Sequence, residues 1–132
     1  MDYITWEDAF NTGNKDIDTQ HHKLISYIND LHASLKTNKS PEELNDVLNG
    51  LTQYTVYHFG LEEKLMIESG YPNFEQHKRE HQIFIERLEK LSYDLNSKNA
   101  RILFRLLTFL KVWFSGHIMN PDKKFVEYLK SK

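Results

Sequence analysis

The sequence predicts an all-α protein: an up-down-up-down antiparallel four-helix bundle with a non-helical N-terminal arm and a short C-terminal helical extension. Apolar residues recur with helical periodicity from about Thr19 onward, and no strand-like run or internal repeat competes with this pattern. The polar connections between the periodic segments are short, which makes successive helices antiparallel neighbours. We therefore expect a single domain over residues 1–132, with the arm at 1–18, the bundle at about 19–120 and the extension at about 121–132.

The first predicted helix follows the arm. The arm carries Trp6 and Phe10, which we expect to dock on the bundle. The apolar stripe of the helix consists of His21, Leu24, Ile25, Ile28, Leu31 and Leu35. Spacings of three and four residues place this stripe on one helix face. The apolar pattern of this helix ends at a polar connection at 36–39.

The second predicted helix has a clear start signal. Ser40 is a suitable N-cap, Pro41 suits the first helical position, and Glu43 completes a capping box. Its stripe consists of Leu44, Val47, Leu48, Leu51, Tyr54, His58, Glu62 and Leu65. The residues Ser-Gly-Tyr-Pro-Asn at 69–73 then predict a stop and a turn.

The third and fourth predicted helices are separated by a polar break at 96–99. The third has a stripe of Phe74, His77, His81, Phe84, Leu88, Leu91 and Leu95. The fourth has a stripe of Leu103, Leu106, Leu110, Trp113 and His117. Pro121 should end or bend the fourth helix. One more amphipathic stretch follows, with Phe125, Val126 and Leu129.

Composition excludes several classes of function. A formal net charge of −2 provides no basic surface for nucleic acid. The absence of cysteine excludes disulfides, iron–sulfur clusters and cysteine-type zinc sites. No apolar targeting segment is visible in residues 1–14, and the most apolar stretch, 102–114, is too short and too charged to span a bilayer. We expect a cytoplasmic protein that does not insert into a membrane.

Seven ionisable side chains lie on these stripes or just beyond them. They are His21, His58, Glu62, His77, His81, His117 and Asp122. Two pairs within a helix are four residues apart, a spacing that stacks two side chains on one face. The groups lie near the start of the first and third helices and near the end of the second and fourth. In an antiparallel bundle these positions share one end. The sequence therefore predicts a metal centre there, because imidazole and carboxylate together suit iron, zinc or manganese.

The alternative is a chance arrangement of structural residues. A single histidine on an apolar face is usually structural, and for any one of the five that interpretation is favoured. Five histidines at one depth, with two inward carboxylates, would form a buried ionisable cluster that costs several kcal/mol per unpaired charge without a cation. The metal interpretation is therefore favoured for the set.

Other polar residues are expected to lie outside the cluster. His22 lies about 100° round the helix from His21 and should be on the surface. His32 lies at the far end of the bundle and should be structural or exposed. Glu63 and Glu68 should be solvated. Trp113 and Phe114, one turn before His117, should be core residues that wall the site.

Seven ligands are too many for a structural zinc site, which takes four. Two metals are the economical explanation if both carboxylates and one oxide or hydroxide bridge them. This arrangement leaves one position of two octahedral ions open for a small diatomic ligand. The chain contains no Glu-x-x-His pair of the ferritin-like kind and no His-Glu-x-x-His motif. A site rich in histidine and poor in carboxylate favours reversible oxygen binding over oxygen activation.

The residues around the ligands form specific motifs. They are Ile17-Asp18-Thr19-Gln20-His21, His58-Phe59-Gly60-Leu61-Glu62-Glu63, Gly70-Tyr71-Pro72 followed by His77 and His81, and Trp113, His117 and Asp122 at spacings of four and five. These motifs resemble those of the hemerythrins, specifically the single-domain bacteriohemerythrins. The resemblance covers essentially the whole chain, including the arm that bears Trp6.

The resemblance implies a non-haem di-iron centre with an oxo or hydroxo bridge and dioxygen as its ligand. One iron would be held by His77, His81 and His117. The other, with the vacant position, would be held by His21 and His58, and Glu62 and Asp122 would bridge the two. The oxygen pocket would be walled by Ile25, Phe59, Trp113, Phe114 and Ile118. Phe114 stands where many relatives carry a leucine.

Three functions compete. The first is an oxygen carrier, store or delivery protein, more readily a monomer than an oligomer, which supplies an oxygen-consuming enzyme. The second is an enzyme that reduces peroxide or nitric oxide; no acid or base beyond the ligands is evident in the motifs, so we expect no enzyme. The third is an oxygen or redox sensor, which the lack of a signalling domain up to Lys132 argues against. Iron storage is not favoured, because two irons per chain are a poor capacity.

Overall fold

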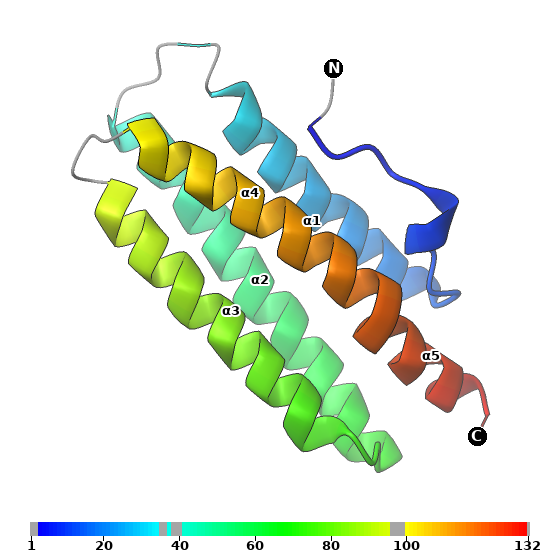
Figure 1. Cartoon of the computed structure of the whole chain (residues 1–132). Helices are drawn as coiled ribbons and strands as arrows, with labels where there is room; N and C mark the ends of the chain where they lie inside the picture. Colours follow the sequence, from blue (N-terminus) through cyan, green and yellow to red (C-terminus); the bar gives the residue numbers. More distant parts are fainter. Residues whose placement is uncertain (1–2, 35–36, 38–40, 96–99, 132) are drawn as a thin grey trace.

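The computed structural model describes residues 3–34, 37, 41–95 and 100–131, which fold into four long helices with shorter helical turns (Figure 1). The elements are η1 (Asp8–Phe10), α1 (Lys15–Ala33), α2 (Pro41–Ser69), α3 (Phe74–Leu95), α4 (Ala100–His117), η2 (Ile118–Asp122) and α5 (Lys123–Lys130). The four long helices lie side by side, each antiparallel to the next, and α4 also packs against α1. The predicted bundle with its C-terminal helical extension is confirmed.

The N-terminal arm lies against α1 (Figure 1). The Ile4 N–H donates to Asn29 Oδ1 at 2.8 Å, and the Asn29 amide donates back to the Ile4 carbonyl at 3.0 Å. Ile4 and Phe10 are buried in the core. Trp6 stacks on His22, with 3.5 Å between the ring centroids. The arm is therefore docked by Trp6 and Phe10, as the sequence predicts.

Helix α1 begins at Lys15, four residues before the expected start of the bundle. The Asn14 side chain accepts a hydrogen bond from the Ile17 N–H at 3.1 Å and so caps the helix. Asp18 accepts hydrogen bonds from the Thr12 N–H and hydroxyl, which ties the arm to the first turn. This first turn is largely polar, so apolar periodicity alone did not reveal it. The arm also contains η1 and is not wholly non-helical.

The turn between α2 and α3 forms where the sequence predicts it. Gly70 adopts φ +67°, in the left-handed region that favours glycine. The Tyr71 N–H donates to the Met66 carbonyl at 2.9 Å, which closes the end of α2. The start of α2 at Pro41 agrees with the start signal. Leu35, the expected N-cap Ser40, most of the connection at 36–39 and the break at 96–99 lie outside the described residues.

The core runs through the middle of the bundle. The prediction is wrong for one residue of the second apolar stripe. The fully buried side chains include Leu24, Leu51, Phe84, Leu88, Leu106 and Leu110. Leu65, by contrast, is 37% exposed. Met66, one position later on α2, is fully buried and takes the interior place that the stripe assigned to Leu65.

Pro121 was predicted to end or bend the fourth helix; α4 ends at His117, and a π-helical turn, η2, which contains Pro121, carries the chain on into α5. Proline has no N–H to donate, and the wider turn accommodates it within a continuous helical path. A turn with i to i+5 bonding also places residues five apart on one face. Asp122 therefore returns to the same face as His117, and this geometry completes the cluster described below.

The helical run Arg101–Lys130 is long and apolar enough to cross a membrane by length and composition alone. The sequence indicated a shorter stretch, because the continuation through η2 was not expected. Nearly half of its apolar window, 47%, is buried inside the bundle. Leu106, Leu107 and Leu110 lie in the core. A core helix accounts for this composition.

Candidate metal centre

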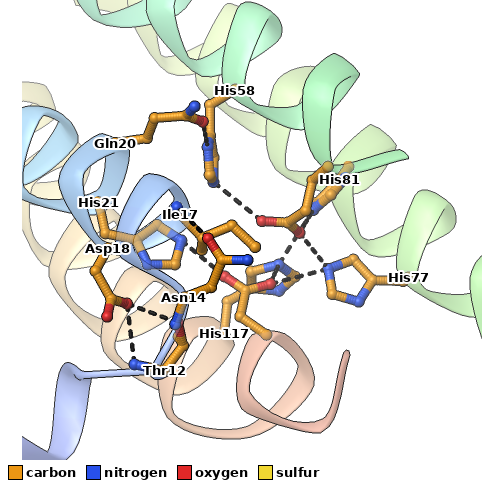
Figure 2. Close-up of polar contacts among 12 residues, drawn as sticks. Thr12, Asn14, Ile17, Asp18, Gln20, His21, His58, His77, His81 and His117 are labelled. Atoms are coloured by element: carbon orange, nitrogen blue, oxygen red, sulfur yellow. Dashed lines mark hydrogen bonds and ion pairs between the residues drawn. The ribbon is translucent and has the colours of Figure 1, made fainter. Parts of the chain in front are cut away.

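All seven predicted ligands are buried, and their side chains meet at one end of the bundle. Helix α1 supplies His21, α2 supplies His58 and Glu62, α3 supplies His77 and His81, α4 supplies His117, and η2 supplies Asp122. Figure 2 shows the five histidines converging from these different elements. Each of the seven is at most 6% exposed. The structure thus brings together every residue that the sequence predicts for this site.

The inner atoms form two groups that share both carboxylates. The first group is Glu62, His77, His81, His117 and Asp122, and the second is His21, His58, Glu62 and Asp122. In each group all the candidate ligand atoms lie within 4.8 Å of one another. We call these groups the three-histidine position and the two-histidine position. Each group is a suitable cage for one cation.

Glu62 turns one oxygen toward each position. Its Oε1 lies 2.8 Å from His77 Nε2 and 3.4 Å from His81 Nε2. Its Oε2 lies 3.1 Å from His58 Nε2. A carboxylate oriented in this way presents one oxygen to each of two ions.

Asp122 divides its oxygens in the same manner. Its Oδ1 lies 3.0 Å from His77 Nε2 and 2.9 Å from His117 Nε2. Its Oδ2 lies 3.0 Å from His21 Nε2. Each carboxylate therefore presents one oxygen to each position, as expected if both carboxylates bridge two metal ions.

The buried donor atoms of the cluster indicate that it fits cations. Both oxygens of Glu62 and of Asp122, and Nε2 of His21 and of His77, make no contact of hydrogen-bond geometry within the described residues and face one another as ion pairs. Buried polar atoms are almost always partnered in native proteins. The donors are imidazole nitrogens and carboxylate oxygens, a set that suits iron, zinc or manganese. The residues present therefore fit a pair of metal ions.

In the absence of metal, the carboxylates and histidines stabilise each other's charge. Burial raises the pKa of Glu62 and Asp122, but the adjacent histidines outweigh it and hold both pKa values well below the ordinary range. Burial lowers the pKa of His77 and His117, but the carboxylates outweigh it. They raise the pKa of His77 to about 9 and that of His117 to about 10.

Metal binding is expected to release protons. His77 and His117 carry a proton at pH 7 in the metal-free protein, because their pKa values are about 9 and about 10. A histidine must lose that proton to coordinate, so we expect about two protons released per chain and an affinity that rises with pH up to about pH 9–10. Calorimetric titration with Zn²⁺ in buffers of different ionisation enthalpy counts these protons. Binding without proton release would contradict the charged state of both rings.

Carboxylates hold the outer nitrogens of two rings at the three-histidine position. Glu63 Oε2 lies 3.0 Å from His81 Nδ1, and Glu80 Oε2 lies 3.6 Å from His117 Nδ1. Such partners fix the ring orientation and strengthen a histidine as a ligand. The prediction that Glu63 is solvated is wrong, since its side chain is 22% exposed and faces His81. Glu80 was not recognised in the sequence.

At the two-histidine position, the outer nitrogen of His58 has a neutral partner. Gln20 Oε1 lies 2.5 Å from His58 Nδ1, which therefore donates to it when Nε2 coordinates a metal (Figure 2). His21 Nδ1 forms no hydrogen bond within the described residues. Gln20 belongs to the motif that precedes His21, but the sequence gives no sign of its contact with His58.

Aromatic rings cover the ligand histidines. Phe59 stacks on His81, with 3.7 Å between centroids and 3° between planes. Trp113 stacks on His117 at 4.3 Å and 13°. Phe114 meets His21 edge-on, with centroids 6.1 Å apart.

The remaining residues of the expected pocket wall, Ile25 and Ile118, are buried in the same hydrophobic core cluster as Phe59 and Phe114. The wall is therefore apolar. That these side chains line an oxygen pocket stays a prediction.

The residues expected outside the cluster are found outside it, apart from Glu63. His22 is exposed and stacks on Trp6. His32 is half-buried and stacks on Tyr3, with centroids 4.5 Å apart. The Glu68 side chain is 59% exposed.

Known proteins share this chain's sequence pattern. The hemerythrin HHE cation binding domain matches residues 12–129, which include all seven candidate ligands. This chain belongs to the hemerythrin family. The bacteriohemerythrin of Stenotrophomonas maltophilia (strain R551-3) is 34% identical over 132 residues, 99% of this chain and 84% of the relative. That of Methylococcus capsulatus is 32% identical over 127 residues, 95% of each chain.

Solved hemerythrin structures share the fold. A wild-type hemerythrin superposes with a TM-score of 0.86 at 30% identity, covering 96% of this chain and 98% of the other. A hemerythrin with a single leucine-to-alanine substitution superposes with a TM-score of 0.88 at 30% identity, covering 98% of each. The resemblance to single-domain bacteriohemerythrins is thereby confirmed.

Proposed function

We propose that this hemerythrin binds dioxygen reversibly at a non-haem di-iron centre and acts as an oxygen carrier, store or delivery protein. The observation that carries the proposal is the pair of donor groups that share Glu62 and Asp122, each carboxylate with one oxygen toward each position. Nitrogen and oxygen donors of this kind suit iron. The cation binding domain of the family agrees with a metal at this place.

The residues would divide the two irons unequally. His77, His81 and His117 would hold one iron, His21 and His58 the other, and Glu62 and Asp122 both. Ferrous iron supplies the electrons that make dioxygen binding possible. The two-histidine position has one protein donor fewer, so it is the place with room for a small ligand.

The protein's own part is to orient the ligands and exclude water. Glu63 and Gln20 hold the outer nitrogens of His81 and His58. The apolar ring of Phe114 faces His21 and keeps water and protons from the open side. A dry pocket favours release of the bound ligand unchanged.

A carrier is supported over a peroxide- or nitric-oxide-reducing enzyme. Such an enzyme needs an acid that delivers protons to the reacting ligand. The acids nearest the cluster, Glu63 and Glu80, are engaged with His81 and His117. An oxygen-consuming enzyme as partner, a monomeric state and a cytoplasmic location stay predictions.

The test is reversible oxygen binding. The iron-loaded protein is reduced without oxygen, then exposed to oxygen and purged in cycles, while visible absorption is followed and iron per chain is counted. We expect two irons per chain and a charge-transfer band that appears and disappears with oxygen. Rapid one-way oxidation of the iron would contradict the carrier proposal and favour a redox sensor or an enzyme. Repeated consumption of peroxide or nitric oxide with a reductant would favour an enzyme.

A further inference from the structure

A cleft between α1 and α2 leads from the surface to the metal centre. It has a volume of about 390 Å³. Its lining includes the exposed residues Asp16, Lys64 and Glu68 and the buried ligands His58 and Glu62. The exposed residues form its mouth and the buried ligands its floor. The cleft therefore ends at two residues of the two-histidine position, which are themselves buried.

The floor of this cleft includes a buried carboxylate of the cluster. Glu62 is 1% exposed, and its oxygens meet other candidate ligands, with Oε2 3.1 Å from His58 Nε2 and Oε1 2.8 Å from His77 Nε2. Among the described residues, two other clefts each reach one ligand, at His77 and at His81, but neither is lined by a carboxylate of the cluster. The α1–α2 cleft is distinguished from them because its lining includes Glu62, which both metal positions share.

Gln20 closes the inner end of the cleft. Its side chain reaches from α1 across to α2, where Oε1 lies 2.5 Å from His58 Nδ1 (Figure 2). This hydrogen bond fixes the plane of the His58 ring. Rotation of the Gln20 side chain would break this hydrogen bond and free the ring to turn toward the cleft.

The charges at the mouth are mixed and favour cations. Asp16 on α1 and Glu68 on α2 are acidic, and Lys64, one turn before Glu68, has its Nζ 4.0 Å from Glu68 Oε1. The two acidic side chains outnumber the one lysine at the mouth. A divalent cation is thus attracted into the cleft, and Lys64 weakens that attraction.

We propose that this cleft is the route by which a divalent cation reaches and leaves the two-histidine position, and that Gln20 is the positioning residue that closes it. The proposal rests on the dinuclear site of the proposed function. The two-histidine position has four protein donors against five at its neighbour. It is therefore filled second and emptied first.

Charge variants with opposite expected signs test the route. Metal-free protein is mixed with Co²⁺ at low ionic strength, and uptake of the two ions is followed by visible absorption. Asp16→Asn should slow the second uptake phase about threefold and Lys64→Gln should speed it about threefold, and both effects should fade in 1 M salt. Glu86→Gln, at the cleft that reaches His81, is the matched control and should load at the wild-type rate.

Gln20 variants test the closing residue. Gln20→Ala should release one of the two Co²⁺ ions about tenfold faster into a chelator, as expected for loss of a partner of a ligand histidine. Gln20→Glu should restore slow release, because a carboxylate accepts the same hydrogen bond. Equal acceleration of both ions, or no recovery with Gln20→Glu, would overturn the positioning role.

The outcomes separate this proposal from the proposed function. If wild-type protein takes up two Co²⁺ ions but the Asp16 and Lys64 variants load at the wild-type rate, the route is wrong and the dinuclear site stands. If wild-type protein takes up fewer than two, the dinuclear site itself fails.

Discussion

Replacing His117 by alanine is expected to remove one metal ion from the centre. His117 belongs to the three-histidine position alone. Its loss removes the donor that faces Asp122 Oδ1 at 2.9 Å, and it opens a cavity beneath Trp113, which stacks on its ring. We expect the iron content to fall from two per chain to about one, and oxygen-dependent absorption to disappear, since a site that lacks a ligand binds metal much more weakly. Elemental analysis after desalting, with visible spectra, measures both.

The control for this variant is His22→Ala. His22 is the sequence neighbour of the ligand His21, but it is exposed and contacts Trp6 rather than the cluster. This variant should keep two irons and lose only the stacking contact. Normal iron content and oxygen spectra in His117→Ala would refute the assignment of His117. Loss of the site in His22→Ala would show that the wrong neighbour was chosen.

Asp122→Asn is expected to weaken both metal positions at once. Oδ1 faces His77 and His117, and Oδ2 faces His21, so the carboxylate serves both groups of donors. Asparagine keeps the size but has one acceptor oxygen and no charge. We expect fewer than about one iron per chain after desalting, a larger loss than in His117→Ala. Retention of two irons would contradict the bridging role.

The same variant has a pH signature in the metal-free protein. Its histidines should lose the charge partner that helps to raise their pKa, so the pKa of His77 should fall from about 9 and that of His117 from about 10. NMR titration of the imidazole protons measures this directly. Asp46→Asn, which changes an exposed carboxylate on α2, is the matched control and should leave both values in place.

Stability should follow the same linkage. A raised folded-state pKa contributes stability that is full below the ordinary histidine pKa and is lost as the pH rises through about 9 and about 10. The lowered pKa of Asp122 contributes stability that is present above its unfolded value and is lost as the pH falls. The advantage of wild type over Asp122→Asn in unfolding free energy should therefore be largest between the ordinary pKa values of aspartate and histidine, and it should be lost above about pH 10. A wild-type advantage that persists in strong base would argue against the ion-paired cluster.

The helices and the ligands themselves were predictable because they depend on local periodicity. Residues four apart share a helix face, so His77 and His81 must point the same way wherever α3 lies. Short connections force antiparallel neighbours, which brings early and late positions to the same end. The glycine turn at Gly70 is also local, since its positive φ needs no distant partner. The sequence alone therefore predicts that the five histidines and two carboxylates lie together.

Sequence periodicity alone was insufficient where the outcome depends on how helices face each other. Glu63 lies beside Glu62 in the chain, yet the rotation of α2 against α3 decides that it meets His81 and not solvent. The prediction that Leu65 faces the interior was wrong for a related reason, because the last turns of α2 bury Met66 instead.

The local periodicity of this chain determined four amphipathic helices and the seven groups that lie at one end of them. The tertiary structure alone decided which atoms of those groups meet and what surrounds them. Gln20 and His58 are 38 residues apart, so their contact depends on the packing of α1 on α2. Asp122 returns to the face of His117 because a π-helical turn continues through Pro121. The first outcome depends on the packing of two helices and the second on a turn wider than an α-helical one, so neither follows from α-helical spacing.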